Sequence, residues 1–350
     1  MKIGILTFHW ATNYGAILQA YALQEYLKSQ GHEVDIINYK PKKYDFSWIN
    51  VVRHPSNLLH LRSVLLDRDK EQCLQQWREN NLCMTERFYT TDDLKVIAND
   101  YDAFISGSDQ ILNPSFTICG EGYPTSAYYL SFAGTTKQRI GYAVSFGCTT
   151  YPDNAKRYAK EWIKSFDKIG VRERTGLDIL KELEYTRPQS IVPDPTILYG
   201  SKLFEKLDIE ENSDKDYLYV YMLRGRTVSP EYLKNVQTKI VYADDNGKTA
   251  TMERWLGRIR NAGQMITNSY HGMIVALLFH IPFAVLLETK WGIGMNDRFY
   301  TLLKTLKLEG RIVGNSYSEI NAVFSKKIDW HMVDDMVKKY AEIGSNYLFN

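Results

Sequence analysis

The chain has 350 residues, a mass of 40.6 kDa and 43 basic against 41 acidic residues, so its formal net charge is only +2. This length suggests two domains of ordinary size. The near balance of charge argues against a nucleic-acid protein driven by a basic field, and 44% hydrophobic with 24% charged residues is a globular composition, not a disordered one.

The first residues do not form a secretory signal, because only a few apolar residues follow Lys2 before polar ones appear. The longest apolar stretch, residues 272–287, is interrupted by His280 and Pro282 and is shorter than a membrane-spanning helix. We therefore expect a soluble, cytoplasmic protein, and association with the inner face of a membrane stays open.

The cysteines show neither C-x-x-C nor zinc-finger spacing; they are Cys73, Cys83, Cys119 and Cys148. In a large cytoplasmic chain such residues are expected to be free thiols in the core. No H-E-x-x-H, Walker or G-x-S-x-G motif is present, and no ligand cluster is visible in the sequence. We expect neither a metal ion nor a cofactor.

The start of the chain predicts a β-α-β unit. An apolar run over residues 2–6 is followed by a polar loop over 7–13, and then by apolar residues at helical spacing up to Leu27. Gly31 suits the left-handed residue just past a helix, and residues 33–39 are typical of a strand. The natural product of this order is a parallel sheet.

Residues 40–100 are less regular, with helices expected around 57–67 and 70–81, and we interpret them as a helical insertion. Strands return over 103–106, 139–146, 168–171 and 190–192, with helices over 155–166 and 175–183. A polar stretch over 198–216 suits a linker. A second succession follows, with strands over 217–223, 240–242, 264–267 and 283–287 and helices over 251–262, 271–280, 299–306, 318–324 and 330–347.

The predicted fold is therefore α/β, with two Rossmann-like domains facing across a cleft. The first is expected over residues 1–198, with the helical insertion around 40–100, and the second over 199–350, with the terminal helices. Doubly wound sheets bind ligands beyond the carboxyl ends of their strands, so the residues that follow each strand are the candidates for a site.

Two candidate segments follow strands of the first domain. Asn13, Tyr14 and Gly15 begin the first helix, whose N–H groups could bind an anion, although the loop lacks the G-x-G-x-x-G fingerprint of dinucleotide sites. Ser108 and Asp109 offer a hydroxyl and a carboxylate for a sugar or for catalysis. The alternative in both places is a capped turn that binds nothing.

Two more candidates lie further along the first domain. Arg172 follows a strand and could form a bidentate bond to a carboxylate or phosphate, or alternatively a structural pair with Glu173. Asp194 lies between two prolines, and it could act in catalysis or simply cap backbone amides in a rigid turn.

The segment ITNSYHG, residues 266–272, is the most informative. Asn268, Ser269 and Tyr270 follow a strand, and His271 stands at the start of an apolar helix, where the helix dipole attracts anions. His271 is thus placed to be a general acid or base beside an anionic substrate. The alternative is a histidine packed in the core.

In their order and spacing, six segments resemble the polysaccharide pyruvyl transferase family. They are KIGILTFHWATNYGAILQAYAL, YDAFISGSDQILNP, IGYAVSFG, VRERTG, VPDPTIL and ITNSYHGMIVALLFHIPFAVL, and they cover most of residues 1–310. The resemblance implies a GT-B-like architecture. It also implies transfer of the pyruvyl group of phosphoenolpyruvate to two hydroxyls of a sugar in a surface or capsular polysaccharide precursor, free or lipid-linked, which gives a cyclic ketal and releases phosphate.

The resemblance places the family's motif histidine on His271 and its motif arginine on Arg172. Many members have Arg and then Leu directly before the histidine, where this chain has Ser269 and Tyr270. The replacement candidates for that cation are Arg224, Arg226 and Arg298. We expect His271, Arg172 and Asp194 to be catalytic. Substrate binding is expected from Asn13, Tyr14, Gly15, Ser108, Asp109, Asn268, Ser269, Tyr270 and Arg298.

Two other functions stay open. The first is a GT-B-like glycosyltransferase that uses a nucleotide sugar. The second is a carbohydrate-binding protein without catalysis, which the Ser at position 269 favours.

Overall fold

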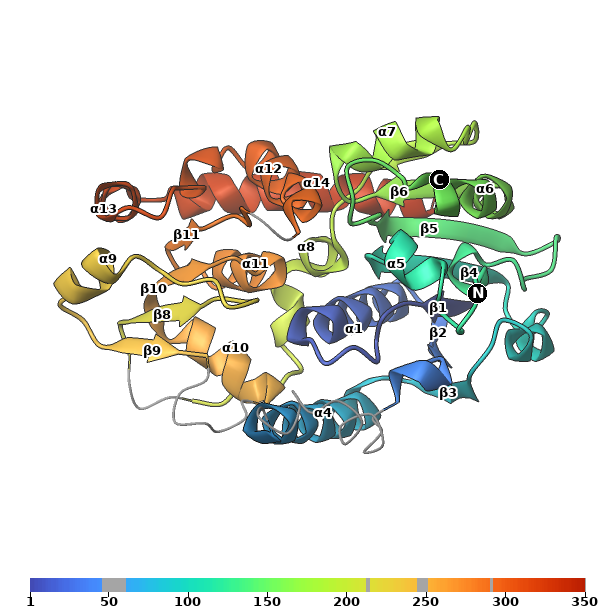
Figure 1. The fold of residues 1–350 in the computed structure, drawn as a ribbon, viewed down its shortest axis with the longest axis horizontal. Coiled ribbons are helices and arrows are strands. Elements are labelled where there is room, and N and C mark those ends of the chain that lie inside the picture. The colour runs from blue at the N-terminus through green and yellow to red at the C-terminus, as the bar shows by residue number, and fades with distance from the viewer. Residues whose placement is uncertain (46–60, 212–214, 244–250, 290–291, 350) are drawn as a thin grey trace.

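Two parallel β-sheets organise the chain, which is described by a computed structural model over residues 1–45, 61–211, 215–243, 251–289 and 292–349 (Figure 1). The larger sheet has the order β3-β2-β1-β4-β5-β6-β7, and the smaller has the order β11-β10-β8-β9. All strand pairs are parallel, as expected when helices connect successive strands.

The strands of the larger sheet are β1 (Lys2–Leu6), β2 (Glu33–Tyr39), β3 (Met84–Phe88), β4 (Ala103–Asp109), β5 (Gln138–Val144), β6 (Lys168–Val171) and β7 (Gln189–Ile191). Those of the smaller sheet are β8 (Tyr217–Tyr221), β9 (Ile240–Tyr242), β10 (Ala262–Thr267) and β11 (Phe283–Val285).

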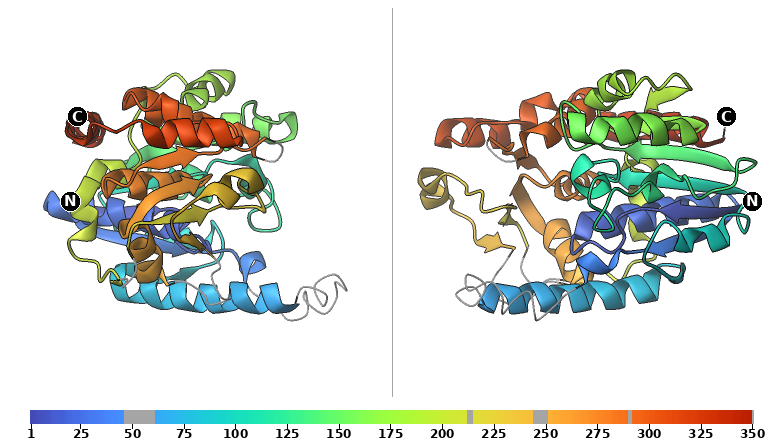
Figure 2. Two further views of the ribbon diagram at one scale, coloured as in Figure 1. Left: turned by 90° about the vertical axis from the view of Figure 1, so that its left-hand side faces the viewer. Right: turned by 45° about the vertical axis from the view of Figure 1, so that its right-hand side comes forward.

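The helices that follow β1 in the chain, up to the first one after β7, are α1 (Tyr14–Ser29), α4 (Leu61–Asn81), α5 (Pro114–Thr117), α6 (Asp153–Trp162), α7 (Arg174–Glu182) and α8 (Pro195–Tyr199). Those that follow are α9 (Pro230–Asn235), α10 (Met252–Arg260), α11 (Tyr270–Leu278), α12 (Asp297–Thr305), α13 (Tyr317–Ser325) and α14 (Trp330–Phe349). In the two turned views of Figure 2, α4 lies along the lower edge of the molecule, away from α14.

One part of the sequence prediction was wrong. Residues 40–100 are not only a helical insertion, because β3 pairs with β2 and forms the edge of the larger sheet. The strand is hard to recognise because its sequence, MTERF, is polar and only Phe88 is fully buried, as suits an edge strand. A single helix, α4, replaces the two expected there, and residues 57–60 of the first lie outside the described residues.

The last helix crosses between the two sheets. The α14 segment was expected with the second domain, but its C-terminal end packs on the first sheet, where the Tyr347 hydroxyl donates to the Gly141 carbonyl at 3.0 Å. Lys168 of β6 donates to the Tyr347 carbonyl at 2.5 Å. The boundary near residue 198 stays a prediction, and α14 ties the two halves together across it.

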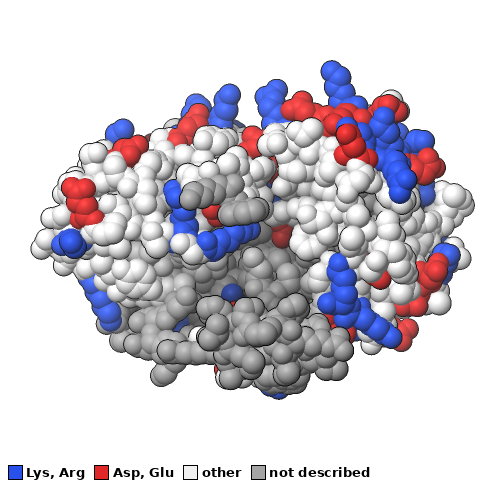
Figure 3. All heavy atoms as spheres, in the orientation of Figure 1, with Lys and Arg blue, Asp and Glu red and all other residues white. Residues whose placement is uncertain are grey.

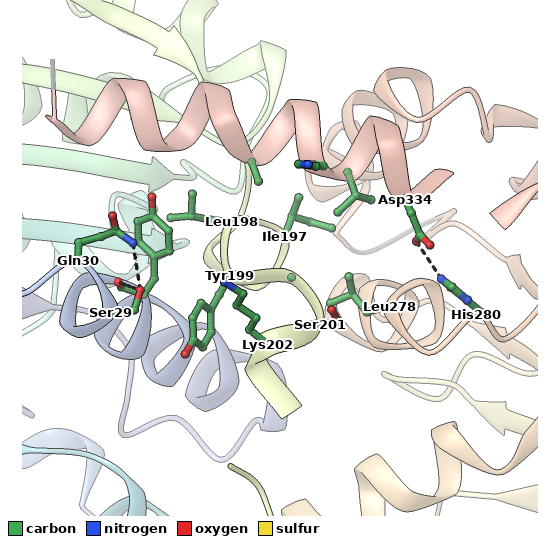
Figure 4. A pocket seen from close by; sticks show the side chains of 15 residues that line it. Ser29, Gln30, Ile197, Leu198, Tyr199, Ser201, Lys202, Leu278, His280 and Asp334 are labelled. Atoms are coloured by element: carbon green, nitrogen blue, oxygen red, sulfur yellow. Dashed lines mark hydrogen bonds and ion pairs between the residues drawn. The ribbon is translucent and has the colours of Figure 1, made fainter. Parts of the chain in front are cut away.

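A pocket of about 570 Å³ lies where the two halves meet, lined by residues of α1, α8, α11 and α14. Figure 4 shows this pocket from close by. At its edge, His280 Nε2 lies 2.8 Å from Asp334 Oδ1, which joins the end of α11 to α14.

The surface shows no segregation of charge on the face drawn in Figure 3, where basic and acidic side chains are interspersed along the upper edge. All four cysteines are free, but none is in the core: Cys83 and Cys119 are exposed, and Cys73 and Cys148 are partly buried. The expectation of core thiols was therefore wrong. Within the described ranges, no helix has both the length and the apolar character needed to cross a bilayer.

Tyr14 and Trp255 join the halves on the α1 side. Their rings stack with centroids 5.0 Å apart and planes 10° apart, and Trp255 is 1% exposed. Aromatic pairs of this kind stabilise an interface beyond the area that they bury.

We expect Trp255→Ala to lower the free energy of unfolding by about 3–5 kcal/mol, because it leaves a large cavity at this contact. Trp255→Phe is expected to cost less, since it keeps a ring and removes an indole N–H that has no partner among the described residues. Denaturant unfolding followed by circular dichroism measures both. Equal losses for the two variants, or a loss within about 0.5 kcal/mol for alanine, would contradict this assignment.

Candidate active site

The carboxyl ends of the two sheets bring the candidate residues together. Asp109 ends β4, Arg172 follows β6, Asp194 follows β7, and His271 follows β10 of the other sheet. Four elements far apart in the sequence therefore converge where the two halves meet. We call Ser108, Asp109, Arg172, Asp194 and His271 the Asp194 cluster.

Asp194 is the centre of this cluster. Its Oδ1 accepts hydrogen bonds from the backbone N–H and the hydroxyl of Thr196, at 3.0 and 2.7 Å, so it is the N-cap of α8. Its Oδ2 accepts from Arg172 Nη1 at 3.0 Å and lies 3.4 Å from His271 Nε2. The capping role and the contact with the candidate catalytic residues are therefore both present.

Arg172 is wholly enclosed by acidic groups. Its side chain is 0% exposed, and Nη2 donates to Asp109 Oδ1 at 3.1 Å while Nη1 donates to Asp194. Glu173 Oε2 lies 3.6 Å from Nε. Asp109 keeps a left-handed backbone, with φ at +73°, and is the most open acid of the three, with 15% of its side chain exposed.

Ser108 connects the cluster to the sheet. Its hydroxyl donates to the Ala143 carbonyl at 2.9 Å and lies 3.4 Å from Asp194 Oδ2. Its backbone N–H donates to the side-chain carbonyl of Gln19 at 3.0 Å, which fixes the end of β4 against α1.

The His271 imidazole lies between Asp194 and the first turn of α1. A Cβ atom added to Gly15 would stand 2.2 Å from His271 Nδ1, so only glycine leaves room for the ring at this position. Asn13 caps the same turn, accepting from the N–H groups of Gly15 and Ala16 at 2.9 and 3.3 Å. The ring thus lies where the N-termini of α1 and α11 meet.

Tyr270 carries two guanidinium groups against its ring. The Arg172 Cζ lies 4.9 Å from the ring centroid and the Arg298 Cζ lies 5.2 Å from it. Arg298 is 8% exposed, and none of the described residues forms a hydrogen bond or ion pair with it; its Nε is buried without a partner. Asp109 and Glu173 act on Arg298 only through space, so its buried N–H groups lack direct acceptors, which makes the place beside Arg298 suited to an anionic ligand.

The charges within the cluster are strongly coupled. Although burial favours the neutral acid, His271 and Arg172 hold the pKa of Asp194 well below its usual range. Burial likewise opposes ionisation of Asp109, but Arg172, His271 and Arg298 lower its pKa. Burial raises the pKa of Glu173 despite the nearby Arg172. Burial and the neighbouring Arg172 charge lower the pKa of Arg298 to about 10, so it stays a cation at neutral pH.

Four of the expected binding residues have visible structural contacts. Asn13 and Ser269 are the N-caps of α1 and α11, and Ser269 Oγ accepts from the Gly272 N–H at 3.1 Å. Tyr14 stacks on Trp255. Asn268 clamps the loop after β8, accepting from the Leu223 N–H at 2.6 Å and donating to its carbonyl at 3.0 Å. Their binding roles stay predictions.

The three replacement candidates for the missing motif arginine differ in their surroundings. Arg224 is paired with Glu288 at 3.3 Å and its side chain is 45% exposed, and Arg226 donates to the Thr289 hydroxyl at 3.2 Å. Only Arg298 lies beside Arg172 and Tyr270. It is therefore the candidate placed next to the cluster.

One residue of this site was not singled out from the sequence. Thr196 holds Asp194 with two hydrogen bonds. The segment PDPT contained a signal for it, since the backbone N–H two residues after an N-cap commonly donates to the capping side chain. The alternative expected for Arg172, a structural pair with Glu173, is present as a contact of 3.6 Å, together with the ion pairs to Asp109 and Asp194.

This arrangement can bind an anion and move a proton. It supplies a buried guanidinium, the N-termini of several helices and an imidazole held by an ionised carboxylate. Among the described residues, no group of three or more His, Cys, Asp and Glu side chains is placed to hold a metal ion.

Several solved structures are similar to this chain in fold. A candidate UDP-N-acetylglucosamine 2-epimerase from Listeria monocytogenes has a TM-score of 0.54 at 11% identity, covering 96% of this chain and 90% of its own. The UDP-GlcNAc 2-epimerase of Neisseria meningitidis, bound to UDP-GlcNAc, has a TM-score of 0.50 at 9% identity over 99% of both chains.

A third similar structure is Arabidopsis thaliana UGT89C1 in complex with UDP-L-rhamnose, with a TM-score of 0.50 at 9% identity over 97% of this chain and 94% of its own. At these identities the likeness concerns the fold alone. It confirms the predicted α/β, GT-B-like architecture.

Comparison of the amino-acid sequence identifies a family, whereas the solved structures show only the fold. A search of curated proteins finds no significant match. The sequence model described as Polysaccharide pyruvyl transferase matches residues 13–288, which include every member of the Asp194 cluster. Because this match spans most of the chain and confirms the resemblance seen in the sequence, the chain belongs to the polysaccharide pyruvyl transferase family.

Proposed function

We propose that the protein transfers the pyruvyl group of phosphoenolpyruvate onto two hydroxyls of a sugar, forming a cyclic ketal and releasing phosphate. The observation that carries this proposal is the buried Arg298 guanidinium, which shares the Tyr270 ring with Arg172 and forms no hydrogen bond or ion pair among the described residues. A polysaccharide precursor is the acceptor class that the family implies.

The donor brings a phosphate and a carboxylate, so its site needs cationic and N–H donors. Arg172 is already neutralised by its ion pairs with Asp109 and Asp194, whereas Arg298 forms no ion pair or hydrogen bond among the described residues. Arg298 is therefore the guanidinium that gains a partner when the donor binds. Many family members have an arginine at the position of Ser269, and in this chain Arg298 takes over the role of that arginine.

Ketal formation requires two proton movements around the donor. A proton is added to the methylene carbon, and the first sugar hydroxyl attacks C2 and loses its proton. The C2–O bond then breaks, the electron pair leaves with the phosphate, and the second hydroxyl attacks C2 and loses its proton to close the ring. One proton ends on carbon and one on phosphate, so the two given up by the hydroxyls are accounted for.

His271 is the group that moves a proton in this scheme. Its Nε2 faces Asp194 Oδ2 at 3.4 Å, so an N–H there leaves Nδ1, beside α1, as the nitrogen that exchanges a proton with substrate. The ionised Asp194 orients the ring, as a buried carboxylate does for other catalytic histidines. Asp109, the most open acid, is positioned to orient an acceptor hydroxyl.

The test is phosphate release from phosphoenolpyruvate with a panel of free and lipid-linked galactosides and mannosides, with the acceptor product weighed by mass spectrometry. We expect acceptor-dependent release with the ketal product. His271→Ala should lower turnover by about 10²–10⁴-fold, the usual contribution of one acid–base group.

His280→Ala is the matched control, because His280 follows the same helix, is largely exposed and contacts Asp334. It should keep wild-type turnover. Wild-type turnover in His271→Ala would contradict the role of His271. Consumption of a nucleotide sugar in place of phosphoenolpyruvate would support a glycosyltransferase, and sugar binding without any donor turnover would support a binding protein.

Arg298 gives a separate prediction. Arg298→Ala is expected to raise the KM for phosphoenolpyruvate roughly 10- to 100-fold, because a charge-assisted hydrogen bond contributes about 1.5–3 kcal/mol. Arg298→Lys should retain part of the affinity. Steady-state kinetics with varied donor concentration measures both.

The melting temperature separates this role from a structural one. Since Arg298 forms no ion pair or hydrogen bond among the described residues and contacts only the rings of Tyr270 and Phe299, Arg298→Ala should lower Tm only slightly, while the donor KM rises strongly. Arg224→Ala and Arg226→Ala are the controls and should keep the donor KM. A donor KM unaffected by Arg298→Ala, or raised equally by the controls, would refute the assignment.

A further inference from the structure

A second cavity lies on the same edge of the larger sheet as the Asp194 cluster. It has a volume of about 610 Å³ and is lined by the loop after β1, by the loop after β2 with the 3₁₀ turn Lys42–Tyr44, by Arg87 and by one face of α4. Nothing in the proposed donor chemistry uses this cavity. It is large enough for one or two sugar rings.

One wall of the cavity is aromatic and fixed in orientation. The rings of Trp10 and Tyr44 lie 4.6 Å apart at an angle of 31°, and Phe8 meets Trp10 edge-on at 5.6 Å. The Trp10 indole N–H donates to the Tyr128 hydroxyl at 3.3 Å. The Lys40 ammonium stands 5.9 Å from the centroid of the Trp10 ring. The partly exposed indole thus offers a rigid aromatic surface beside a hydrogen-bond donor, a combination that suits a sugar ring with its hydroxyls.

The rest of the lining is polar and of mixed charge. It includes Asp67, Arg68, Glu71, Gln72 and Gln75 of α4, together with Lys40, Lys43, Asp45 and Arg87. Glu71 accepts from the Thr12 hydroxyl at 2.7 Å, which joins α4 to the loop that carries Trp10. Four basic and three acidic side chains leave almost no net charge, which does not favour a polyanion such as a nucleotide, whereas carboxylate and amide groups hydrogen-bond well to neutral hydroxyls.

The cavity is joined to the Asp194 cluster by a short piece of chain. Trp10 and Thr12 line the cavity, Asn13 caps α1, and Gly15 touches the His271 ring. Trp10 and Gly15 are five Cα–Cα steps apart along the chain, so their backbones are at most roughly 18 Å apart. A chain of a few sugars can span that length.

We propose that this cavity is an acceptor subsite, in which a sugar residue of an oligosaccharide binds at a distance from the sugar that receives the pyruvyl group. The proposal rests on the proposed function for the identity of the acceptor. The ligand is a neutral sugar that stacks on Trp10 and hydrogen-bonds to α4. Its binding would select an extended acceptor over a monosaccharide.

The test uses galactose- and mannose-based oligosaccharides of one to four residues, with acceptor KM measured by phosphate release from phosphoenolpyruvate. In the wild type, KM should fall as the acceptor lengthens. Trp10→Ala should raise KM for the longer acceptors about tenfold and leave the monosaccharide and the donor KM unchanged. Gln75→Ala, at an exposed position of α4, should act in the same direction without risk to the fold.

Tyr123→Ala is the matched control, because Tyr123 is an exposed aromatic residue away from this cavity, and it should change nothing. A KM that is independent of acceptor length, or a Trp10→Ala effect that is equal for all lengths, would overturn the proposal.

Calorimetric titration of the same oligosaccharides into the protein separates this proposal from the proposed function. Trp10-dependent binding of the longer sugars without donor turnover would support the subsite and count against pyruvyl transfer. Absence of binding by any of these sugars to the wild type would overturn the subsite, whatever the donor kinetics show.

Discussion

The buried carboxylate of Asp194 is the interaction on which the rest of the site depends. One oxygen is held by Thr196 at the start of α8, and the other lies between Arg172 of the first half and His271 of the second. Removing one partner of such a buried group leaves an uncompensated charge, which typically costs about 3–5 kcal/mol. The Asp194 carboxylate therefore links the two halves and also orients the candidate catalytic groups. Gly15 leaves the space that the His271 ring needs beside α1.

Much of the fold could be predicted because β/α periodicity is a local property. The strands over residues 2–6, 33–39, 168–171 and 240–242 were placed at their observed bounds. The edge strand β3 was missed, since a polar edge strand carries little hydrophobic pattern. The rule that ligands bind beyond strand ends singled out Asp109, Arg172, Asp194 and His271, and the structure brings these side chains together, three from the larger sheet and His271 from the smaller. The sequence could not show that Arg298 lies beside Tyr270, because that contact joins two separate helices of the second half.

The two sites proposed for this chain lie on one edge of the larger sheet and differ in character. The Asp194 cluster is buried and charged, and Arg298 beside it is a cation that forms no ion pair or hydrogen bond among the described residues. The cavity at Trp10 is wider, aromatic on one side and mixed in charge on the other. A small dianionic donor fits the first, and an uncharged extended acceptor fits the second. The α1 N-terminus, between Asn13 and Gly15, is the point at which the two substrates would meet.

The most direct measurement uses phosphoenolpyruvate with ¹⁸O in the oxygen that bridges C2 and phosphorus. Pyruvyl transfer breaks the C2–O bond, so with acceptor present all of the label should leave in the phosphate, and the ketal should contain none. Label found in free pyruvate, with unlabelled phosphate, would mean that the P–O bond is broken instead. That result would contradict pyruvyl transfer at the Asp194 cluster.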